Sequence, residues 1–388
     1  MIAFLAIFFS IYGLMHTYVL VRAGTALELG LATILPLAFF MVLMIWAPII
    51  VRLFENARLI LWARISAIVG YTWMGLVLLL VTAFIIVDLF RLALFLLSAS
   101  LQRDLSFLIP PAAPTFKVSL MCVVLVALYG WFEARTIRTD RIVVRSPKIS
   151  AGAGPLRIVQ ISDVHVGLIV RRSRLKRIVE RVRKASPDLI VSTGDLVDGQ
   201  MDDLDGIANL LNQATPRYGK FAVTGNHEFY AGLDQALAFT RRAGFRVLRG
   251  EVVTILDAIN IVGVDDPSGP GYRSSNNGDE GLLSRSVNGK FTLFLKHRPD
   301  IAPQSTGLFD LQLSGHLHDG QIFPFRLLVR LFYPHIAGLR ALPGGSLLYV
   351  SRGSGTWGPP IRFLAPPEVT ILDLMPETPS SRHADHLT

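Results

Sequence analysis

The stretch that decides the fold is LRIVQISDVH, residues 156–165. Its first part, Leu156–Ile161, is rich in apolar and β-branched residues and predicts a buried strand. Asp163 and His165 follow directly, so the strand would present both side chains at its carboxyl end. Open α/β sheets bind their ligands outside the carboxyl ends of their strands. The sequence therefore predicts a functional site at this edge of a sheet.

Four further fragments follow the same pattern, each after a short apolar run. They are Gly194-Asp195-Leu196-Val197-Asp198, Gly225-Asn226-His227-Glu228, a lone His297, and Gly315-His316-Leu317-His318. For any one of these histidines, a hydrogen-bonded core position would be the simpler interpretation. That interpretation does not account for five fragments in one order, so we expect their polar side chains to gather at one site.

These polar side chains match the chemistry of a site for two metal ions. Four histidines, two aspartates and one asparagine can hold two divalent ions about 3.5–4 Å apart, as in enzymes that displace groups at phosphorus. A shell of nitrogen and oxygen ligands suits Mn, Fe, Zn or Co better than Mg or Ca. The candidate ligands are Asp163, His165, Asp195, Asn226, His297, His316 and His318.

The five fragments resemble the motifs of the calcineurin-like metallophosphoesterase superfamily, D-x-H, G-D-x-x-D, G-N-H-[DE], H and G-H-x-H. The resemblance extends over residues 156–374 and includes its membrane-associated branch, whose members join several transmembrane helices to this domain. It implies a four-layer α/β/β/α sandwich at 156–375. It also implies hydrolysis of a phosphate mono- or diester by a metal-activated hydroxide. A lipid-linked substrate would follow if residues 323–342 form an interfacial segment beside the site.

The resemblance assigns roles to the individual residues by motif. One metal ion would be held by Asp163, His165 and His318, the other by Asn226, His297 and His316, and Asp195 would bridge them. His227 would act as general acid toward the leaving oxygen, and Asp198 would orient its ring. Asp319 departs from the usual glycine of the last motif. It would add negative charge near the metals, which leaves substrate preference more open than metal binding.

Several functions stay open at this stage. Besides an esterase, the chain could be a pyrophosphatase of a nucleotide-activated lipid precursor, or a non-catalytic membrane scaffold or sensor. The complete ligand set argues against the scaffold. A nucleic-acid partner is not favoured, because the formal charge of +9 comes with basic segments near membrane spans rather than with an aromatic-studded groove. The sequence does not indicate an oligomeric state.

The first third of the chain, 1–136, predicts a transmembrane helical domain. A bilayer core about 30 Å thick requires about 20 apolar residues per helix. Four runs are long enough for this, at Ile2–Val21, Leu29–Val51, Ile65–Val87 and Phe116–Phe132. Within them, His16 and the pair Asp88 and Arg91 are the candidates for transport or sensing. The pair lies three residues apart near a helix end, so we expect its members to bond to each other.

The loop charges predict which side of the membrane the second domain occupies. With four spans, the second loop and the segment after the last span lie on the same side, and together they hold eight basic residues against three or four on the opposite side. Cytoplasmic flanks collect Lys and Arg, which places the second domain in the cytoplasm. A missed or miscounted span would invert this orientation.

The remaining segments carry weaker predictions. Residues 137–155, basic and then rich in Ser, Ala and Gly, predict a flexible linker, and 376–388 predict a disordered tail. Residues 171–184 predict a helix with a basic outer face, which is either solvated or directed at anionic lipid or substrate. Residues 323–342 alternate apolar residues with arginine, which fits an interfacial segment or a core helix equally well.

Overall fold

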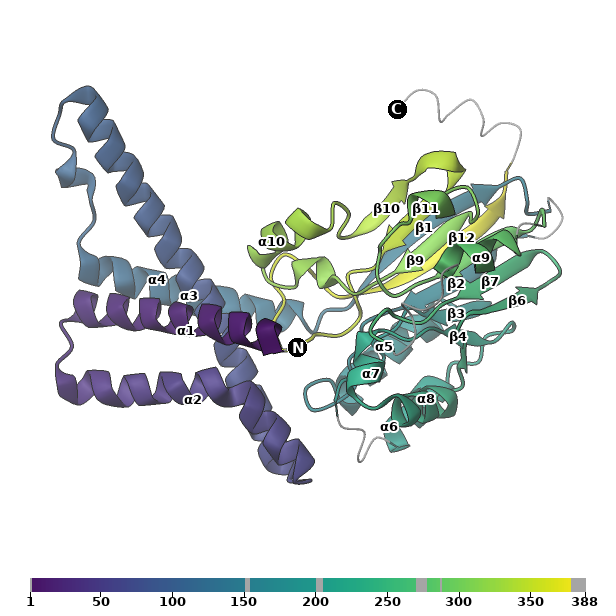
Figure 1. Ribbon diagram of the computed structural model, residues 1–388, viewed down its shortest axis with the longest axis horizontal. Coiled ribbons are helices and arrows are strands. Elements are labelled where there is room, and N and C mark those ends of the chain that lie inside the picture. Colours follow the sequence, from purple (N-terminus) through teal and green to yellow (C-terminus); the bar gives the residue numbers. More distant parts are fainter. Residues whose placement is uncertain (1, 151–153, 200–204, 270–277, 287, 378–388) are drawn as a thin grey trace. The chain divides into compact units, whose positions relative to one another are not determined.

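The computed structural model describes residues 2–150, 154–199, 205–269, 278–286 and 288–377, which form two compact units (Figure 1). One unit comprises the chain up to Phe132 together with 358–363, and the other comprises the rest. Residues 151–153 of the predicted linker and 378–388 of the predicted tail lie outside the described residues.

The first unit consists mainly of four long helices, and all four are long and apolar enough to cross a membrane. They are α1 (Ile2–Leu27), α2 (Leu31–Asn56), α3 (Ile60–Leu101) and α4 (Ala112–Glu133), with the short 3-10 helix η1 (Ser106–Leu108) before α4. Large apolar side chains remain exposed along them, which suits helices surrounded by lipid tails. The prediction of four apolar N-terminal helices is confirmed.

Contacts between these helices rely on small residues and on one polar link. A Cβ atom at Gly70 of α3 would collide with the side chain of Ala47 in α2, so the two helices approach closely only because glycine is present. His16 of α1 accepts a hydrogen bond from the indole N–H of Trp73 in α3 at 2.9 Å, and its Nδ1 lies 2.7 Å from the carbonyl oxygen of Tyr12. The bond to Trp73 joins α1 to α3, and the contact with Tyr12, one turn earlier in α1, holds the His16 ring in place.

The second unit is built on two six-stranded sheets. The first has the order β1-β12-β2-β3-β4-β5, and the second has the order β10-β11-β9-β8-β7-β6. Strands β2 to β5 run parallel, as do β11, β9, β8 and β7. The strands are β1 (Arg138–Ser146), β2 (Leu156–Ile161), β3 (Leu189–Ser192), β4 (Lys220–Ala222), β5 (Arg246–Val247), β6 (Glu251–Ile255), β7 (Ile259–Gly263), β8 (Phe291–Leu295), β9 (Leu311–Ser314), β10 (Gly338–Ala341), β11 (Leu347–Val350) and β12 (Glu368–Pro376).

Helices cover the outer face of each sheet, and a shared core lies between the sheets. Alternate residues of a strand point to opposite faces, so Val159 of β2 packs in the cluster formed with α5, α6 and α8, whereas Ile158 packs with Leu293 of β8 between the sheets. Leu283 of α9 packs on Phe294 at the outer face of the second sheet. The predicted α/β/β/α sandwich is confirmed. The helices are α5 (Arg172–Lys184), α6 (Asp205–Asn212), α7 (Asn226–Tyr230), α8 (Leu233–Arg242), α9 (Gly278–Ser284) and α10 (Phe325–Phe332), with short 3-10 segments η3 (Pro303–Ser305), η4 (His318–Gly320) and η5 (Pro343–Gly345).

The predicted linker at 137–155 is wrong for its first half, because Arg138–Ser146 form strand β1. This strand pairs in parallel with β12 and extends the first sheet by one strand. Val144 is buried, and Arg141 forms an ion pair with the buried carboxylate of Asp373 at 2.5 Å. The arginines that suggest a tether in the sequence thus belong to an edge strand, where exposed basic side chains hinder pairing with another chain.

The two segments predicted to be basic or interfacial, 171–184 and 323–342, differ in how deeply their apolar residues are buried. In α5 the four apolar residues that predict a docking face, Leu175, Ile178, Val179 and Val182, are buried. By contrast, no residue of α10 is fully buried, although Val329 packs against the cluster that contains Ile336, so the helix within 323–342 is not a core helix. Leu331 and Phe332 are 77% and 80% exposed, which is unusual for large apolar side chains on a surface helix.

Candidate metal centre

The strands that deliver the candidate ligands are β2, β3 and β4 in the first sheet and β8 and β9 in the second. Each ligand lies a few residues beyond the carboxyl end of its strand, so side chains from both sheets meet at one edge. In chain order they are Asp163 and His165 after β2, Asp195 after β3, Asn226 after β4, His297 after β8, and His316 and His318 after β9. All are buried except His316, which is partly exposed.

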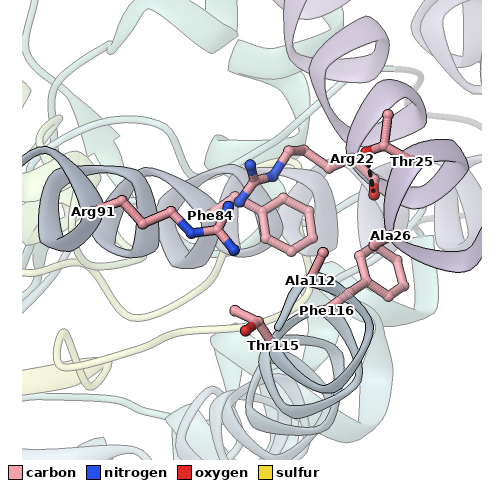
Figure 2. Close-up of a pocket in the computed structure, with 8 residues that line it drawn as sticks. All are labelled: Arg22, Thr25, Ala26, Phe84, Arg91, Ala112, Thr115 and Phe116. Carbon is pink, nitrogen blue, oxygen red and sulfur yellow. Dashed lines mark hydrogen bonds between the residues drawn. The ribbon is translucent and has the colours of Figure 1, made fainter. Parts of the chain in front are cut away.

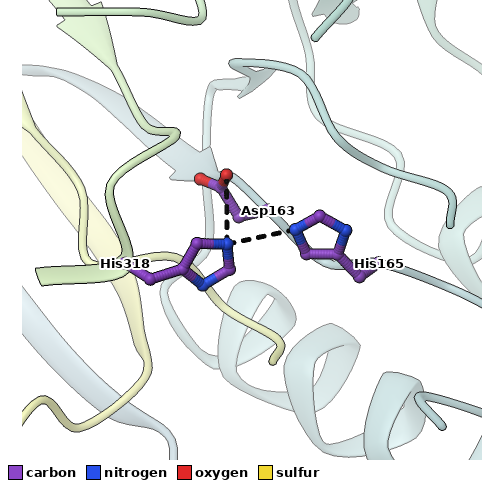
Figure 3. A group of neighbouring side chains, drawn as sticks. All are labelled: Asp163, His165 and His318. Atoms are coloured by element: carbon purple, nitrogen blue, oxygen red, sulfur yellow. Dashed lines mark hydrogen bonds and ion pairs between the residues drawn. The ribbon is translucent and has the colours of Figure 1, made fainter. Parts of the chain in front are cut away.

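The first group of donor atoms comprises Asp163, His165 and His318 (Figure 3). The Nε2 atoms of the two imidazoles face each other 3.1 Å apart, and Asp163 Oδ1 lies 3.5 Å from Nε2 of His318. Asp163 is held in place by the Ser162 hydroxyl at 2.5 Å and by the backbone N–H of His316 at 3.0 Å. Three donor atoms, two from the loop after β2 and one from the loop after β9, thereby lie close to one point.

The second group comprises Asp195, His297 and His316, with Asn226 beside them. From His297 Nε2, the distance is 3.2 Å to each of Asp195 Oδ2, Asn226 Oδ1 and His316 Nδ1. The other ring nitrogen of His297 donates to the carbonyl oxygen of Thr193 at 2.8 Å. That bond fixes the ring orientation and leaves Nε2 to face the group.

Asp195 joins the two groups through a single oxygen. Its Oδ2 atom lies 3.8 Å from Nε2 of His165 and 3.2 Å from Nε2 of His297. Its Oδ1 atom accepts the backbone N–H of His227 at 2.8 Å, which fixes the carboxylate plane. This position between the groups is the geometry that a bridging carboxylate requires.

Backbone conformation at the site is unusual. Five of the seven candidate ligands have a positive φ angle. This conformation costs non-glycine residues of order 1–3 kcal/mol each and is kept only where the surrounding structure holds the backbone in place. The five ligands are Asp163 (50°), His165 (52°), Asp195 (51°), His316 (73°) and His318 (49°). Strain of this kind clusters at active sites and ligand clamps, and here it orients side chains toward a common centre.

Two glycines permit the close approach of these loops. A Cβ atom at Gly225 would collide with the carboxylate of Asp195, and one at Gly315 would collide with Ser162 and with the carboxylate of Asp163. Any larger residue at either position would displace an aspartate of the site.

His227 lies beside both groups without belonging to either of them. Its Nδ1 lies 2.9 Å from Asp198 Oδ1, and its ring packs edge-on against His165 with centroids 4.6 Å apart. Trp357 and Tyr230 also pack edge-on against it. His165, Asp195 and His227 can form a third group of converging donor atoms, which competes with a role of His227 as an acid.

The charges of the site favour bound cations. Burial and the neighbouring His227 lower the pKa of His165 to about 4, and burial with the neighbouring His297 lowers that of His316 to about 3, so both imidazoles are neutral at pH 7 and can donate lone pairs. Burial opposes protonation of His297, but the carboxylates of Asp195 and Asp163 outweigh it and raise its pKa to about 10. Divalent ions would compete with protons for this negative charge.

Glu228 is a structural residue of the site to which the sequence assigns no role. Its buried carboxylate accepts the backbone N–H groups of Asp195 at 3.0 Å, Leu196 at 2.8 Å and Gly225 at 2.6 Å. Burial and the nearby charge of Asp195 raise its pKa to about 7. In the sequence, Glu228 is marked only as the acidic fourth residue of the G-N-H-E fragment. That position does not indicate that its side chain holds the Asp195 loop.

Asp319 has a different environment from the one expected. Its buried carboxylate forms an ion pair with the guanidinium of Arg326 in α10 at 3.0 Å. The extra negative charge beside His318 is therefore compensated by a neighbouring helix, and Asp319 ties η4 to α10.

The donor set fits metal ions in its geometry as well as its chemistry. Two nitrogens bound to one ion at about 2.1 Å lie roughly 3–3.4 Å from each other. The separations of 3.1 and 3.2 Å between histidine nitrogens in the two groups fall in this range. The residues present can hold two divalent ions.

The chain is similar to known proteins over the domain that carries this site. Residues 156–320 match the calcineurin-like phosphoesterase family. An uncharacterized metallophosphoesterase of Aquifex aeolicus is 39% identical over 258 residues, covering 66% of this chain and 98% of the relative. A Helicobacter pylori metallophosphoesterase is 36% identical, and the match covers 57% of this chain and 60% of that protein.

Two further similarities involve Danio rerio proteins. One, named transmembrane protein with metallophosphoesterase domain, is 30% identical over 281 residues, covering 68% of this chain and 64% of that protein. A crystal structure of a dimetal phosphatase is 15% identical, with a TM-score of 0.37, and covers 52% of this chain and 88% of its own.

Proposed function

The chain belongs to the calcineurin-like metallophosphoesterase family, and we propose that it is a membrane-anchored enzyme that hydrolyses phosphate mono- or diesters with two divalent metal ions. The observation that carries this proposal is the oxygen of Asp195 between two groups of inward-facing ligands. A hydrogen-bonded histidine, His227, stands beside them.

In the proposed site each residue has one role. Asp163, His165 and His318 would hold one ion, Asn226, His297 and His316 would hold the other, and Asp195 would contact both. The mixed nitrogen and oxygen shell favours Mn, Fe or Zn. When bound, the two ions activate water and stabilise the charge on the phosphoryl oxygens. The chain itself positions the ions through Glu228, Ser162 and Thr193, which fix the ligand loops and rings.

His227 is proposed to supply the proton to the leaving oxygen. Burial opposes its protonation, but the carboxylates of Asp195 and Asp198 outweigh that effect and raise its pKa to about 9. The neighbouring carboxylates therefore favour the doubly protonated ring. Because Asp198 holds Nδ1, the Nε2–H group is free to face the substrate.

Asp198→Asn should shift the alkaline limit of activity to lower pH. A general acid works below its pKa, and the pKa of His227 falls when the Asp198 charge is removed. We expect kcat for a substrate with a poor leaving group to fall about 10–100-fold at pH 8, with a smaller loss at pH 6. Profiles of kcat against pH for wild type and variant measure this. An unchanged alkaline limb in the variant would contradict the role of Asp198.

Membrane anchoring is supported by the four apolar helices and by relatives that are named transmembrane proteins. The bias of basic residues toward the second loop and the segment after α4 supports a cytoplasmic catalytic unit. We therefore propose an integral membrane protein whose catalytic unit faces the cytoplasm.

A lipid-linked substrate is supported by α10. Its exposed Leu327, Leu328, Leu331 and Phe332 alternate with Arg326 and Arg330, the pattern of a helix that lies in a lipid headgroup region. The helix also borders the ligands: Arg326 pairs with Asp319, and Tyr333 packs edge-on against His316 with centroids 6.3 Å apart. A substrate anchored in lipid would thus approach the ligands along α10.

The test compares soluble and lipid-linked substrates with the full-length chain in Mn²⁺. Leu331→Asp should lower turnover of a lipid-linked pyrophosphate or phosphodiester about tenfold, since one buried leucine contributes about 1.5–3 kcal/mol. Turnover of a soluble aryl phosphodiester should stay unchanged. Leu256→Asp is the matched control, because Leu256 is 51% exposed in the turn between β6 and β7.

The outcomes separate the substrate classes. Equal losses for soluble and lipid-linked substrates would contradict a lipid-contacting role for α10. Preference for the pyrophosphate over the monoester and diester would identify the chain as a pyrophosphatase of a lipid precursor.

A further inference from the structure

A pocket in the helical unit holds two arginine side chains that the proposed catalytic function does not use (Figure 2). We propose that it binds a phosphate-bearing anion, presented as the headgroup of an anionic membrane lipid. Its walls come from the last turns of α1, the second half of α3 and the first turn of α4. The lining residues are Arg22, Thr25, Ala26, Phe84, Arg91, Ala112, Thr115 and Phe116.

Arg22 is fixed in place and its charge is compensated. Its guanidinium forms an ion pair with Asp88 of α3 at 3.0 Å, and Tyr18 donates its hydroxyl hydrogen to the same carboxylate at 2.6 Å. The guanidinium carbon also lies 5.6 Å from the centroid of the Phe84 ring. The expected pairing of Asp88 with Arg91 is therefore wrong, because Arg22 reaches Asp88 from the neighbouring helix.

Arg91 is left with unused hydrogen-bonding capacity. One of its terminal nitrogens donates to the carbonyl oxygen of Pro110 at 3.4 Å, a long contact, and its buried Nε has no hydrogen-bond partner among the described residues. Asp88 pairs with Arg22, and the lining residues contain no carboxylate for Arg91, so the pocket has an excess positive charge. An unsatisfied guanidinium in a pocket is costly unless an anion accepts its hydrogen bonds.

The remaining polar groups also favour an acceptor ligand. The hydroxyl of Thr115 donates to the carbonyl oxygen of Pro111 at 2.6 Å, and that of Thr25 donates to Val21 at 2.9 Å. The donors left for a ligand are guanidinium N–H groups, whose planar fork matches phosphate oxygens. The pocket also adjoins the first residue of α4, Ala112, where the helix dipole is positive.

The position along the helices favours a lipid as the source of the phosphate. Helix α4 has 22 residues and spans about 33 Å, close to the thickness of a bilayer core, and the pocket lies at its first turn. That places the arginines at headgroup depth. Leu89, Phe90 and Leu92 are about half exposed on the same stretch of α3, so acyl chains can continue along the helix surface.

The experiment measures lipid binding to the full-length protein by native mass spectrometry from a neutral detergent. Phosphatidylglycerol, phosphatidylcholine and inorganic phosphate are the probes. We expect one phosphatidylglycerol to bind more tightly than phosphatidylcholine, and Arg91→Gln to weaken it about tenfold, or about 1.4 kcal/mol. Arg103→Gln is the matched control: it removes the same charge from an exposed residue just beyond α3 that does not line the pocket.

A second variant, Arg91→Lys, shows whether a lower lipid affinity comes from lost phosphate contacts or from misfolding. It keeps the charge but loses the planar fork, so its affinity should fall between those of wild type and Arg91→Gln. Equal affinity for both lipids, or equal losses in Arg91→Gln and Arg103→Gln, would overturn the site. Displacement of the lipid by inorganic phosphate at a comparable concentration would support the anion chemistry and overturn the lipid source.

Discussion

Asp195→Asn is expected to abolish phosphoester hydrolysis and to lower metal content below two ions per chain. The same carboxylate oxygen faces the histidines of both ligand groups, at 3.8 Å from His165 and 3.2 Å from His297. An amide is neutral, so asparagine cannot supply the negative charge that the two cations would share. Substituting a residue that only hydrogen-bonds to a metal ligand already lowers metal affinity or activity about 10–100-fold. Substituting the shared ligand itself should therefore lower activity more than about 100-fold.

The substitution is conservative for the fold. Asparagine has the same shape, and its carbonyl oxygen can still accept the backbone N–H of His227, now 2.8 Å from Asp195 Oδ1. The backbone N–H of residue 195 also still donates to Glu228. The loop should therefore stay in place while the metal-binding charge is lost.

Metal analysis and a hydrolysis assay on the same samples measure the effect. Asp257→Asn is the control, because the Asp257 side chain is 93% exposed and pairs with Lys290 away from the ligands. A wild-type protein that binds two ions and hydrolyses none of the phosphoesters would favour the scaffold. Full activity in Asp195→Asn would show that the two groups act without a shared carboxylate.

The sequence predicted the fold and the location of the site because both depend on local patterns. An apolar, β-branched run followed by Asp or His indicates a strand end, and the sandwich brings those ends together. The order of the fragments also limits which strands can be neighbours, since parallel strands joined by helices follow right-handed crossovers. His165 and His318, 153 residues apart, meet because they follow β2 of the first sheet and β9 of the second, and the ligand loops of both sheets meet at one edge of the sandwich.

Other features depend on contacts that no local pattern encodes. Strand β1 has the basic composition of a linker, and only its pairing with β12, more than 200 residues later, makes it a strand. Asp88 bonds to Arg22 across two helices rather than to Arg91 in its own helix. Glu228 stabilises the Asp195 loop through backbone N–H groups, which are present at every residue and leave no trace in the sequence.

His227→Ala is expected to retain both metal ions and to lose rate in proportion to the difficulty of the leaving group. General acid catalysis contributes about 10²–10⁴-fold, and the full loss should appear with an alkyl ester. An aryl ester with an acidic leaving group needs little protonation and should lose far less. The ratio of the two rates in wild type and variant therefore reports proton donation directly.

The same variant decides between two roles that the geometry allows. His165, Asp195 and His227 can converge on one ion, whereas the 2.9 Å bond to Asp198 and the pKa of about 9 favour a protonated ring. A proton donor can be removed without loss of metal, but a ligand cannot. His335→Ala is the control, because His335 bonds to Arg340 outside the site. Loss of an ion in His227→Ala, with uniform loss of rate across leaving groups, would make His227 a ligand instead of an acid.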